Sequence, residues 1–140
     1  MGYIVGLVLC VTRSGEAGIR VQDDAIALAK DRNNSLVFLY VADCSFLDKI
    51  AVGVLWRLAK KELAKMGRFI LAMAVDRALA EGVKAEAVIR SGVLRDVLLQ
   101  VVSEMEVTTI FLEHPVGETC RLDEAELERF LVSSRVGRNK

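Results

Sequence analysis

"EGVKAEAVIRSGVLRDVLLQVVSEMEVTTIFLE" (Glu81–Glu113) contains the pattern on which the fold prediction depends. Apolar residues alternate through Ala85–Arg90, which predicts a strand. After Gly92, apolar residues recur at helical spacing through Val93–Glu104, and Val107–Leu112 is then rich in residues that favour strands. A strand, a helix and a second strand in this order predict two parallel strands joined by a crossover helix.

The same alternation of strands and helices extends to both ends of the chain. Ile4–Thr12 and Leu36–Ala42 are apolar without a break, which predicts strands that are buried on both faces. Helical spacing covers Ile19–Lys30, the long region Phe46–Glu81 and Asp123–Ser134. Strict alternation predicts a single α/β domain over residues 1–140, with an open parallel sheet and helices on both of its faces.

Two of these helices have apolar faces that we expect to pack against the sheet. In the first helix, this face consists of Ile19, Val21, Ala25, Leu28 and Ala29. In the long helical region, it consists of Leu55, Ala59, Leu63, Met66, Ile70, Met73 and Ala74. Met66 and Met73 are interpreted as residues of the core or of a dimer interface. Gly53 and Gly67 weaken the long helix, and either is a candidate for a bend or a break.

The composition argues against several classes of function. Nineteen basic and 19 acidic residues give zero net charge, which does not point to nucleic acid or to an anionic membrane. No apolar run reaches the ~18 residues that a membrane span requires. The three cysteines are odd in number and form no CxxC motif, which argues against a disulfide framework and a structural zinc site. We expect a cytoplasmic protein with a disordered basic tail at about residues 135–140.

Two long stretches and one short one carry a family resemblance. They are Ile4–Asp43, with its strand, short loop, helix and "VFLYVAD"; Glu81–Val107; and the apolar "TTIFLE" that follows. In this pattern and spacing the chain resembles the universal stress protein family over about residues 3–113. The resemblance implies an open sheet of strand order 3-2-1-4-5 and frequent dimers. It also implies a candidate ATP site, because many members use an Asp after the first strand and a glycine loop after the fourth.

This chain departs from the family at most of the ATP-binding positions. The Asp position falls on Thr12 or Arg13, and the first glycine of the loop falls on Glu113. The second glycine falls on Val116, and the third falls near Glu126, followed by a leucine where the family has a hydroxyl. Gly92 does match a family position near the ligand, although a turn residue with positive φ explains it equally well.

The resemblance and its departures together predict a binding or regulatory module that is not an enzyme, needs no cofactor and does not bind ATP. A carboxylate at Glu113 would repel a triphosphate, and Pro115 lacks an N–H donor. The residues expected around any remaining ligand pocket are Thr12, Arg13, Asp43, Gly92, Glu113 and His114. One alternative is a degenerate site for AMP or another adenine ligand. A less favoured alternative is a small hydrolase that uses Cys44 and His114 as nucleophile and base.

Two other clusters at this end of the sheet have simpler explanations. Asp43, Glu113 and His114 could hold a metal, but an Asp after a strand more often shapes its own loop, and no metal is predicted. Arg13, Arg90 and Arg95 could receive a small anion, but pairing with nearby acids is the simpler interpretation.

The end of the chain bears on assembly. "SSRVGRNK", after the last predicted helix, lacks the apolar run of a fifth strand, so the predicted strand order is 3-2-1-4. Val107–Leu112 would then be a bare edge, which soluble proteins normally cover. We expect a homodimer through this strand, or the C-terminal segment folding back over it. Asp123 and Glu126 are spaced as a capping box at the start of the last helix.

Overall fold

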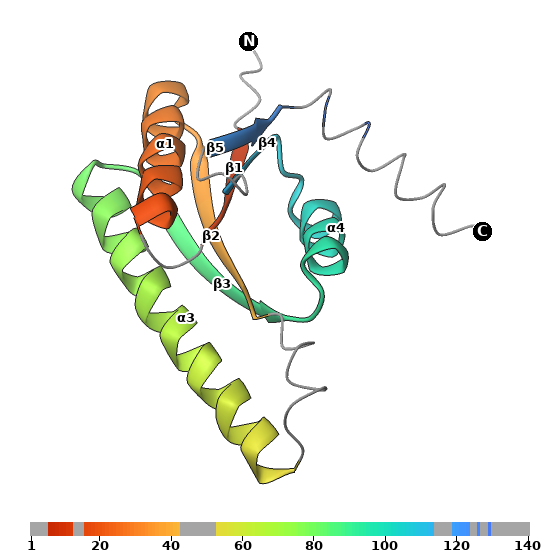
Figure 1. Cartoon of the computed structure of the whole chain (residues 1–140). Coiled ribbons are helices and arrows are strands. Elements are labelled where there is room, and N and C mark those ends of the chain that lie inside the picture. The colour runs from red at the N-terminus through yellow and green to blue at the C-terminus, as the bar shows by residue number, and fades with distance from the viewer. Residues whose placement is uncertain are drawn as a thin grey trace.

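The fold is an open sheet with helices on both of its faces (Figure 1). The computed structural model describes residues 6–12, 16–42, 53–113 and 119–123, together with residues 126 and 129. The elements are β1 (Leu7–Val11), α1 (Glu16–Arg32), β2 (Ser35–Ala42), α3 (Val54–Ala80), β3 (Ala85–Ser91), α4 (Leu94–Met105), β4 (Thr109–Glu113) and β5 (Thr119–Leu122). Every strand and helix predicted between Ile4 and Leu112 is present, although the predicted starts at Ile4 and Phe46 lie outside the described residues. Of the last predicted helix, Asp123 is described and is not helical, whereas Glu126 and Arg129 are helical.

The parallel strands have the predicted order β3-β2-β1-β4. β1 lies between β2 and β4, and its Leu9 is aligned with Val37 on one side and with Ile110 on the other. Apolar side chains on both faces of β1 explain this central position, because a strand at the centre of the sheet is covered on both faces. The carboxyl ends of all four strands lie along one edge, which is where open α/β sheets bind ligands.

The predicted absence of a fifth strand is wrong. β5 pairs antiparallel with β4, with Ile110 aligned with Leu122 and Glu113 with Thr119. The connection between them contains Pro115 and Gly117, residue types that favour turns, so a hairpin is compatible with this sequence. The sequence prediction considers a fifth strand only after the last predicted helix, whereas β5 precedes that helix. β4 is therefore not an edge strand, and a dimer formed through Val107–Leu112 is excluded because both sides of β4 are already paired.

Hydrogen bonds hold the end of β5 close to the start of β4. The Thr109 hydroxyl donates to Asp123 Oδ1 at 3.3 Å, and Arg121 Nε donates to the same oxygen at 3.1 Å. The Asp123 N–H donates to Glu126 Oε2 at 2.6 Å, which is one of the two bonds of the predicted capping box. The sequence thus places a helix start directly after the strand that completes the sheet.

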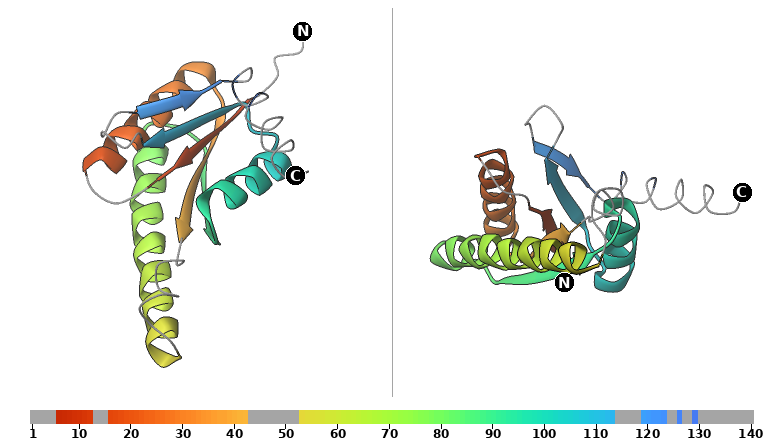
Figure 2. Two further views of the ribbon diagram at one scale, coloured as in Figure 1. Left: turned by 45° about the vertical axis from the view of Figure 1, so that its right-hand side comes forward. Right: turned by 60° about the horizontal axis from the view of Figure 1, so that its bottom comes forward.

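The sheet separates two apolar clusters, one on each face. α1 and α3 lie on one face of the sheet and α4 lies on the other (Figure 2). Val8, Cys10 and Phe38 belong to the cluster covered by α1 and α3, whereas Leu9 and Leu39 belong to the cluster covered by α4. Side chains along a strand alternate between faces, so successive residues of β1 supply both clusters. The prediction that helices cover both faces is confirmed.

The apolar face of α1 differs from the predicted face at its first turn. Val21, Ala25 and Ala29 are fully buried, as predicted, but Ile19 is half exposed. Gln22 is buried on the same face of the helix. A face defined only by apolar residues therefore missed a polar residue that also points into the interior.

α3 is the longest helix and extends beyond the end of the sheet (Figure 1). Gly53 precedes its first turn with φ 65°, and the helix passes through Gly67 without a break. Its buried residues are Gly67, Leu71, Ala74 and Ala78. The predicted face is confirmed at Ala74, which is buried, and Ala59, Leu63 and Ile70 are half-buried. It is wrong at Leu55, Met66 and Met73, which are exposed. No described helix is long and apolar enough to cross a membrane.

Candidate functional site

Thr12 and Gly92 lie at the carboxyl edge of the parallel sheet. The Thr12 N–H donates to the Leu39 carbonyl at 2.9 Å, which ties the end of β1 to β2. The Gly92 N–H donates to the Ala42 carbonyl at 3.2 Å, which ties the end of β3 to the other side of β2. These two predicted pocket residues therefore lie on either side of the same strand.

The other predicted pocket residues are described only in part. Glu113 is the last residue of β4, and its backbone position at this edge agrees with the sequence, but its side chain lies outside the described residues. Arg13, Asp43 and His114 lie outside the described residues altogether, as does Cys44 of the alternative catalytic pair. Within the described part of the chain, no three His, Cys, Asp or Glu side chains cluster as a metal site requires.

A chain of polar side chains begins at Thr12 and runs through the layer between the sheet and two helices. Gln22 of α1 donates from Nε2 to the Thr12 hydroxyl oxygen, and both side chains are buried. Arg77 of α3 donates to Gln22 Oε1 at 2.6 Å and forms an ion pair with Asp23. The chain therefore links β1 to α1 and α3, and it ends at the surface on an exposed carboxylate.

These hydrogen bonds involve Thr12, which lies where the family resemblance expects a ligand-binding acid. The Thr12 side chain is 1% exposed and already accepts a hydrogen bond from Gln22. A buried hydroxyl that is held by a buried amide stabilises the fold and has no free surface for a ligand. Sequence reasoning missed Gln22 and Arg77. The available signal was that Gln22 lies one residue after Val21 and three before Ala25, and hence on the buried face.

Cys10 lies next to this polar chain in the buried layer. Burial raises the pKa of the Cys10 thiol far above its ordinary value of 9.0, and the negative charge of Asp24 raises it further, whereas Arg77 opposes the shift. A thiol that stays protonated is neither a nucleophile nor a metal ligand. In this environment Cys10 acts as a small buried hydrophobe.

Gly92 has φ 139°, so the positive φ predicted for it is present. A Cβ at this position would lie 3.1 Å from Val97 Cγ2, which adds crowding to the backbone strain. We expect Gly92→Ala to lower the free energy of unfolding by about 2 kcal/mol, measured by urea denaturation.

Gly82→Ala is the matched control for this substitution. Gly82 also has positive φ, 78°, but a Cβ there would have no atom within 4 Å. We expect Gly82→Ala to lower the free energy of unfolding by about 1 kcal/mol, which is the cost of the backbone conformation alone. Equal losses for the two variants would contradict the proposed contact with Val97.

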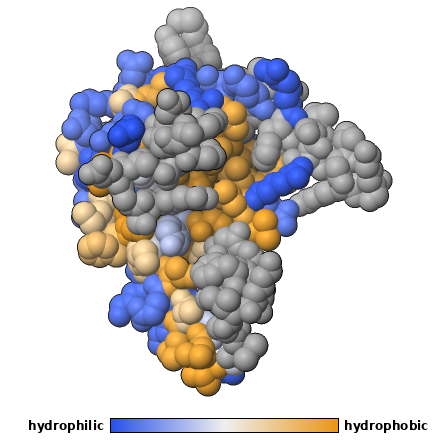
Figure 3. Space-filling model, in the orientation of Figure 1, coloured by the Kyte–Doolittle hydropathy of each residue, from blue (hydrophilic) through white to orange (hydrophobic). Residues whose placement is uncertain are grey.

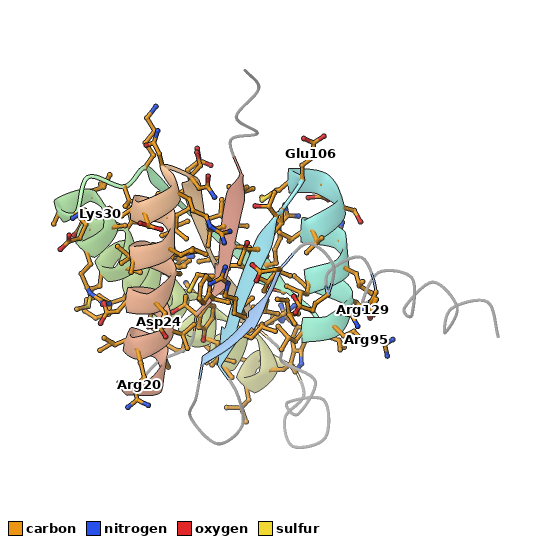
Figure 4. The ribbon with its side chains drawn as sticks, turned by 90° about the horizontal axis from the view of Figure 1, so that it is seen from above. Arg20, Asp24, Lys30, Arg95, Glu106 and Arg129 are labelled. Atoms are coloured by element: carbon orange, nitrogen blue, oxygen red, sulfur yellow. The ribbon has the colours of Figure 1, made fainter. Side chains whose placement is uncertain are left out.

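Two of the three arginines considered for an anion site are described, and Arg13 is not. Arg90 Nη2 lies 3.2 Å from Glu104 Oε2, so its partner is an acid of α4. Arg95 belongs to α4, on the opposite side of the sheet from α1 with its Arg20 and Asp24 (Figure 4). Arg95 also has an interaction of its own. The interpretation that these arginines are paired is favoured over an anion site.

A hollow of about 730 Å³ lies between α1 and α3. Its polar lining includes Lys30, Glu81, Arg77 and Asp23. Lys30 Nζ lies 2.9 Å from Glu81 Oε2, and Arg77 pairs with Asp23, so the opposite charges largely neutralise one another. Asp31 also lines the hollow, so its charged residues leave a single net negative charge.

The comparisons with known proteins rest on structure. No family model matches the chain, and no curated protein matches it in sequence. A universal stress protein family structure from Burkholderia pseudomallei matches with a TM-score of 0.68 at 19% identity, covering 96% of this chain and 94% of that one. UspA from Lactobacillus plantarum matches with a TM-score of 0.65 at 16% identity, covering 76% and 74%.

A third similar structure contains a ligand. It is an Arabidopsis thaliana universal stress protein family protein with AMP bound, with a TM-score of 0.53 at 17% identity, covering 73% of this chain and 72% of that one. At these identities the similarity establishes the fold, and the strand order of this chain agrees with it. The chain therefore has the fold of the universal stress proteins.

Proposed function

We propose that this chain is a non-catalytic regulatory module that does not bind ATP and acts through association with protein. The observation that carries the proposal is the path of the chain after β4. Residues Thr119–Leu122 return as an antiparallel strand, so this segment pairs with β4. A phosphate site of the family type needs glycine backbone N–H groups that surround the anion, whereas Thr119–Leu122 of this segment carry no glycine and are paired within the sheet.

Two residue choices support the same proposal. Glu113 ends β4 at the carboxyl edge, where a carboxylate would repel a phosphate group. Thr12 replaces or adjoins the family's acid and is held by Gln22 inside the protein. Both features oppose a charged nucleotide.

An adenine mononucleotide is the second candidate ligand. The similar Arabidopsis thaliana structure has AMP bound, and this chain retains a glycine at position 92. AMP carries one phosphate, so it depends less than ATP on a glycine loop. A site of this kind would use the carboxyl edge beside Gly92.

Calorimetric titration with ATP, ADP and AMP tests both candidates. We expect no ATP binding with Kd below roughly 100 µM, which corresponds to about −5.5 kcal/mol. AMP binding with a lower Kd than that of ATP would support the second candidate. A tight ATP isotherm, or ATP retained through purification, would show that the first is wrong.

Paired variants identify where any weak binding occurs. If ATP binds weakly at the carboxyl edge, Glu113→Gln should lower the Kd for ATP, because the substitution removes a negative charge. Glu86→Gln, on β3, removes an exposed carboxylate near the amino end of the sheet. This substitution should leave the Kd for ATP unchanged. Equal effects of the two substitutions would place the binding elsewhere.

A further inference from the structure

The outer side of α3 carries an exposed stripe with the spacing of a coiled-coil seam. Its residues recur at alternating intervals of three and four, and all of them are exposed: Leu55, Leu58, Glu62, Lys65, Phe69 and Ala72. This spacing keeps the residues in line along a helix that packs against another helix. We call this set the α3 stripe.

The α3 stripe is apolar at both ends and charged in the middle. Leu55 and Phe69 are each 67% exposed, and Leu58 is 54% exposed. Apolar surface is visible at the N-terminal end of α3 (Figure 3). The stripe is about 25 Å long at the rise of an α-helix. Exposed large apolar side chains at both ends of one stripe form a surface that a second molecule can cover.

The order of charges along the α3 stripe suits a second copy of the same stripe. When two such helices lie antiparallel about a twofold axis, Glu62 faces Lys65 of the second copy, and the twofold repeats this pair. In the same register Leu58 faces Phe69. Neither Glu62 nor Lys65 has an ion-pair partner among the described residues, so both charges are available.

We propose that the protein forms a twofold dimer in which the α3 stripes pack antiparallel. A parallel arrangement would place Glu62 opposite Glu62 and Lys65 opposite Lys65, so the charges select the antiparallel one. This inference names the partner in the protein association proposed above and rests on that part of it. The dimer does not depend on nucleotide binding. A nucleotide titration that contradicts the proposed function would therefore leave the proposed dimer unaffected.

The dimer should be of moderate strength. A single helix pair buries less surface than most stable interfaces. In addition, Lys61 would face Arg68 of the second copy along one flank of the seam, which places two positive charges near each other. These long exposed side chains can turn into solvent, but they repel one another at low salt. We expect Kd on the order of 10 µM, a value at the weak end of specific association.

Sedimentation velocity over a range of concentrations tests the proposal on the full chain. We expect Phe69→Ser to weaken association at least tenfold. Ile19→Ser is the matched control, because Ile19 is also a half-exposed apolar residue but lies on α1. Thermal melting of both variants should match that of the wild-type monomer. A wild-type chain that stays monomeric at 100 µM, or equal effects of the two substitutions, would overturn the proposal.

A charge exchange tests whether the two stripes face each other. Glu62→Lys and Lys65→Glu should each abolish self-association, because each places like charges across the twofold. Mixing the two variants should restore a dimer, since every charge at the centre then faces its opposite. A mixture that stays monomeric would overturn the proposed register, and a single variant that still dimerises as wild type would do the same. Both sites are exposed, and circular dichroism checks that each variant is folded.

Discussion

Gly67→Leu should lower the free energy of unfolding by about 3 kcal/mol, even though leucine favours helices more than glycine does. Gly67 is buried where α3 crosses β2. A Cβ at this position would lie 2.6 Å from Tyr40 Cε1 and 3.0 Å from Cγ. The ring would have to move, and it is packed against the apolar cluster beneath α1 and α3. Crowding at this crossing therefore outweighs the gain of about 1 kcal/mol in helix propensity.

Urea denaturation of a graded set of variants measures this effect. Gly67→Ala should cost less than Gly67→Leu, since only the Cβ then meets the ring. In a Tyr40→Leu background, the cost of Gly67→Ala should fall, because the atoms that crowd the new methyl group have been removed. An unchanged cost in that background, or a stabilising Gly67→Leu, would contradict the steric explanation.

Gly67 also illustrates which parts of the fold the sequence predicts. Glycine inside a helical pattern suggests a bend when propensity is considered alone. The structure instead keeps the helix intact and uses the missing side chain to bring α3 close to Tyr40. The distance between helix and sheet is a tertiary property, so helical spacing could not reveal it.

The parallel direction of the strands was predictable because it follows from local patterns, whereas their order was implied by the resemblance to the universal stress proteins. Continuous apolar strands such as Leu36–Ala42 must be covered on both faces, and crossover helices fix the direction of the strands. β5 was not predictable in the same way. Thr119–Leu122 has only four residues and no apolar run, so its pairing with β4 depends on the turn before it and on a free strand edge.

The exposed side of α3 was misassigned for a related reason. Leu55 and Met73 were predicted to face the sheet because apolar residues usually do. α3 has apolar residues on more than one side, and periodicity cannot decide which side meets the sheet. Contact with β2 and β3 selects the side that contains Gly67 and Ala74. Other apolar residues are left on the surface, and the proposed dimer would cover Leu55, Leu58 and Phe69 among them.

The candidate site was predicted in position but not in its interactions. Thr12 and Gly92 lie at the carboxyl edge, as the order of strands requires. The hydrogen bonds from Thr12 to Gln22 and from Gln22 to Arg77 join residues of β1, α1 and α3. Contacts between residues this far apart in sequence depend on how the helices pack, which a single sequence does not specify.

Thr12→Val should lower the free energy of unfolding by about 2 kcal/mol. Valine has nearly the shape of threonine and also favours strands, so packing changes little. The substitution removes the acceptor for Gln22 Nε2, and the Gln22 side chain is only 3% exposed. A buried donor without an acceptor retains its full desolvation cost, which is why the loss exceeds the worth of an ordinary hydrogen bond.

Thr108→Val is the matched control for the loss of a hydroxyl. The Thr108 hydroxyl donates to the Leu7 carbonyl at 3.1 Å, and the Thr108 N–H donates to the same oxygen at 2.9 Å. The carbonyl therefore keeps a donor when the hydroxyl is removed, and the expected loss is below about 1 kcal/mol. A loss as large as that of Thr12→Val would mean that the cost comes from the threonine itself and not from an unpaired partner.

The double variant Thr12→Val with Gln22→Met separates the hydrogen bond from its surroundings. Methionine has a similar length to glutamine but carries no amide, so neither residue of the pair is left with an unpaired polar group. Replacing both partners of a buried pair with apolar groups can be nearly neutral, and the combined loss should therefore be smaller than the sum of the single losses by at least about 1 kcal/mol. Arg77 keeps its ion pair with Asp23 in this variant, so the charge near the surface stays compensated. Additive losses in urea denaturation would show that Thr12 and Gln22 are not coupled, and the explanation of how the end of β1 is held would then be wrong.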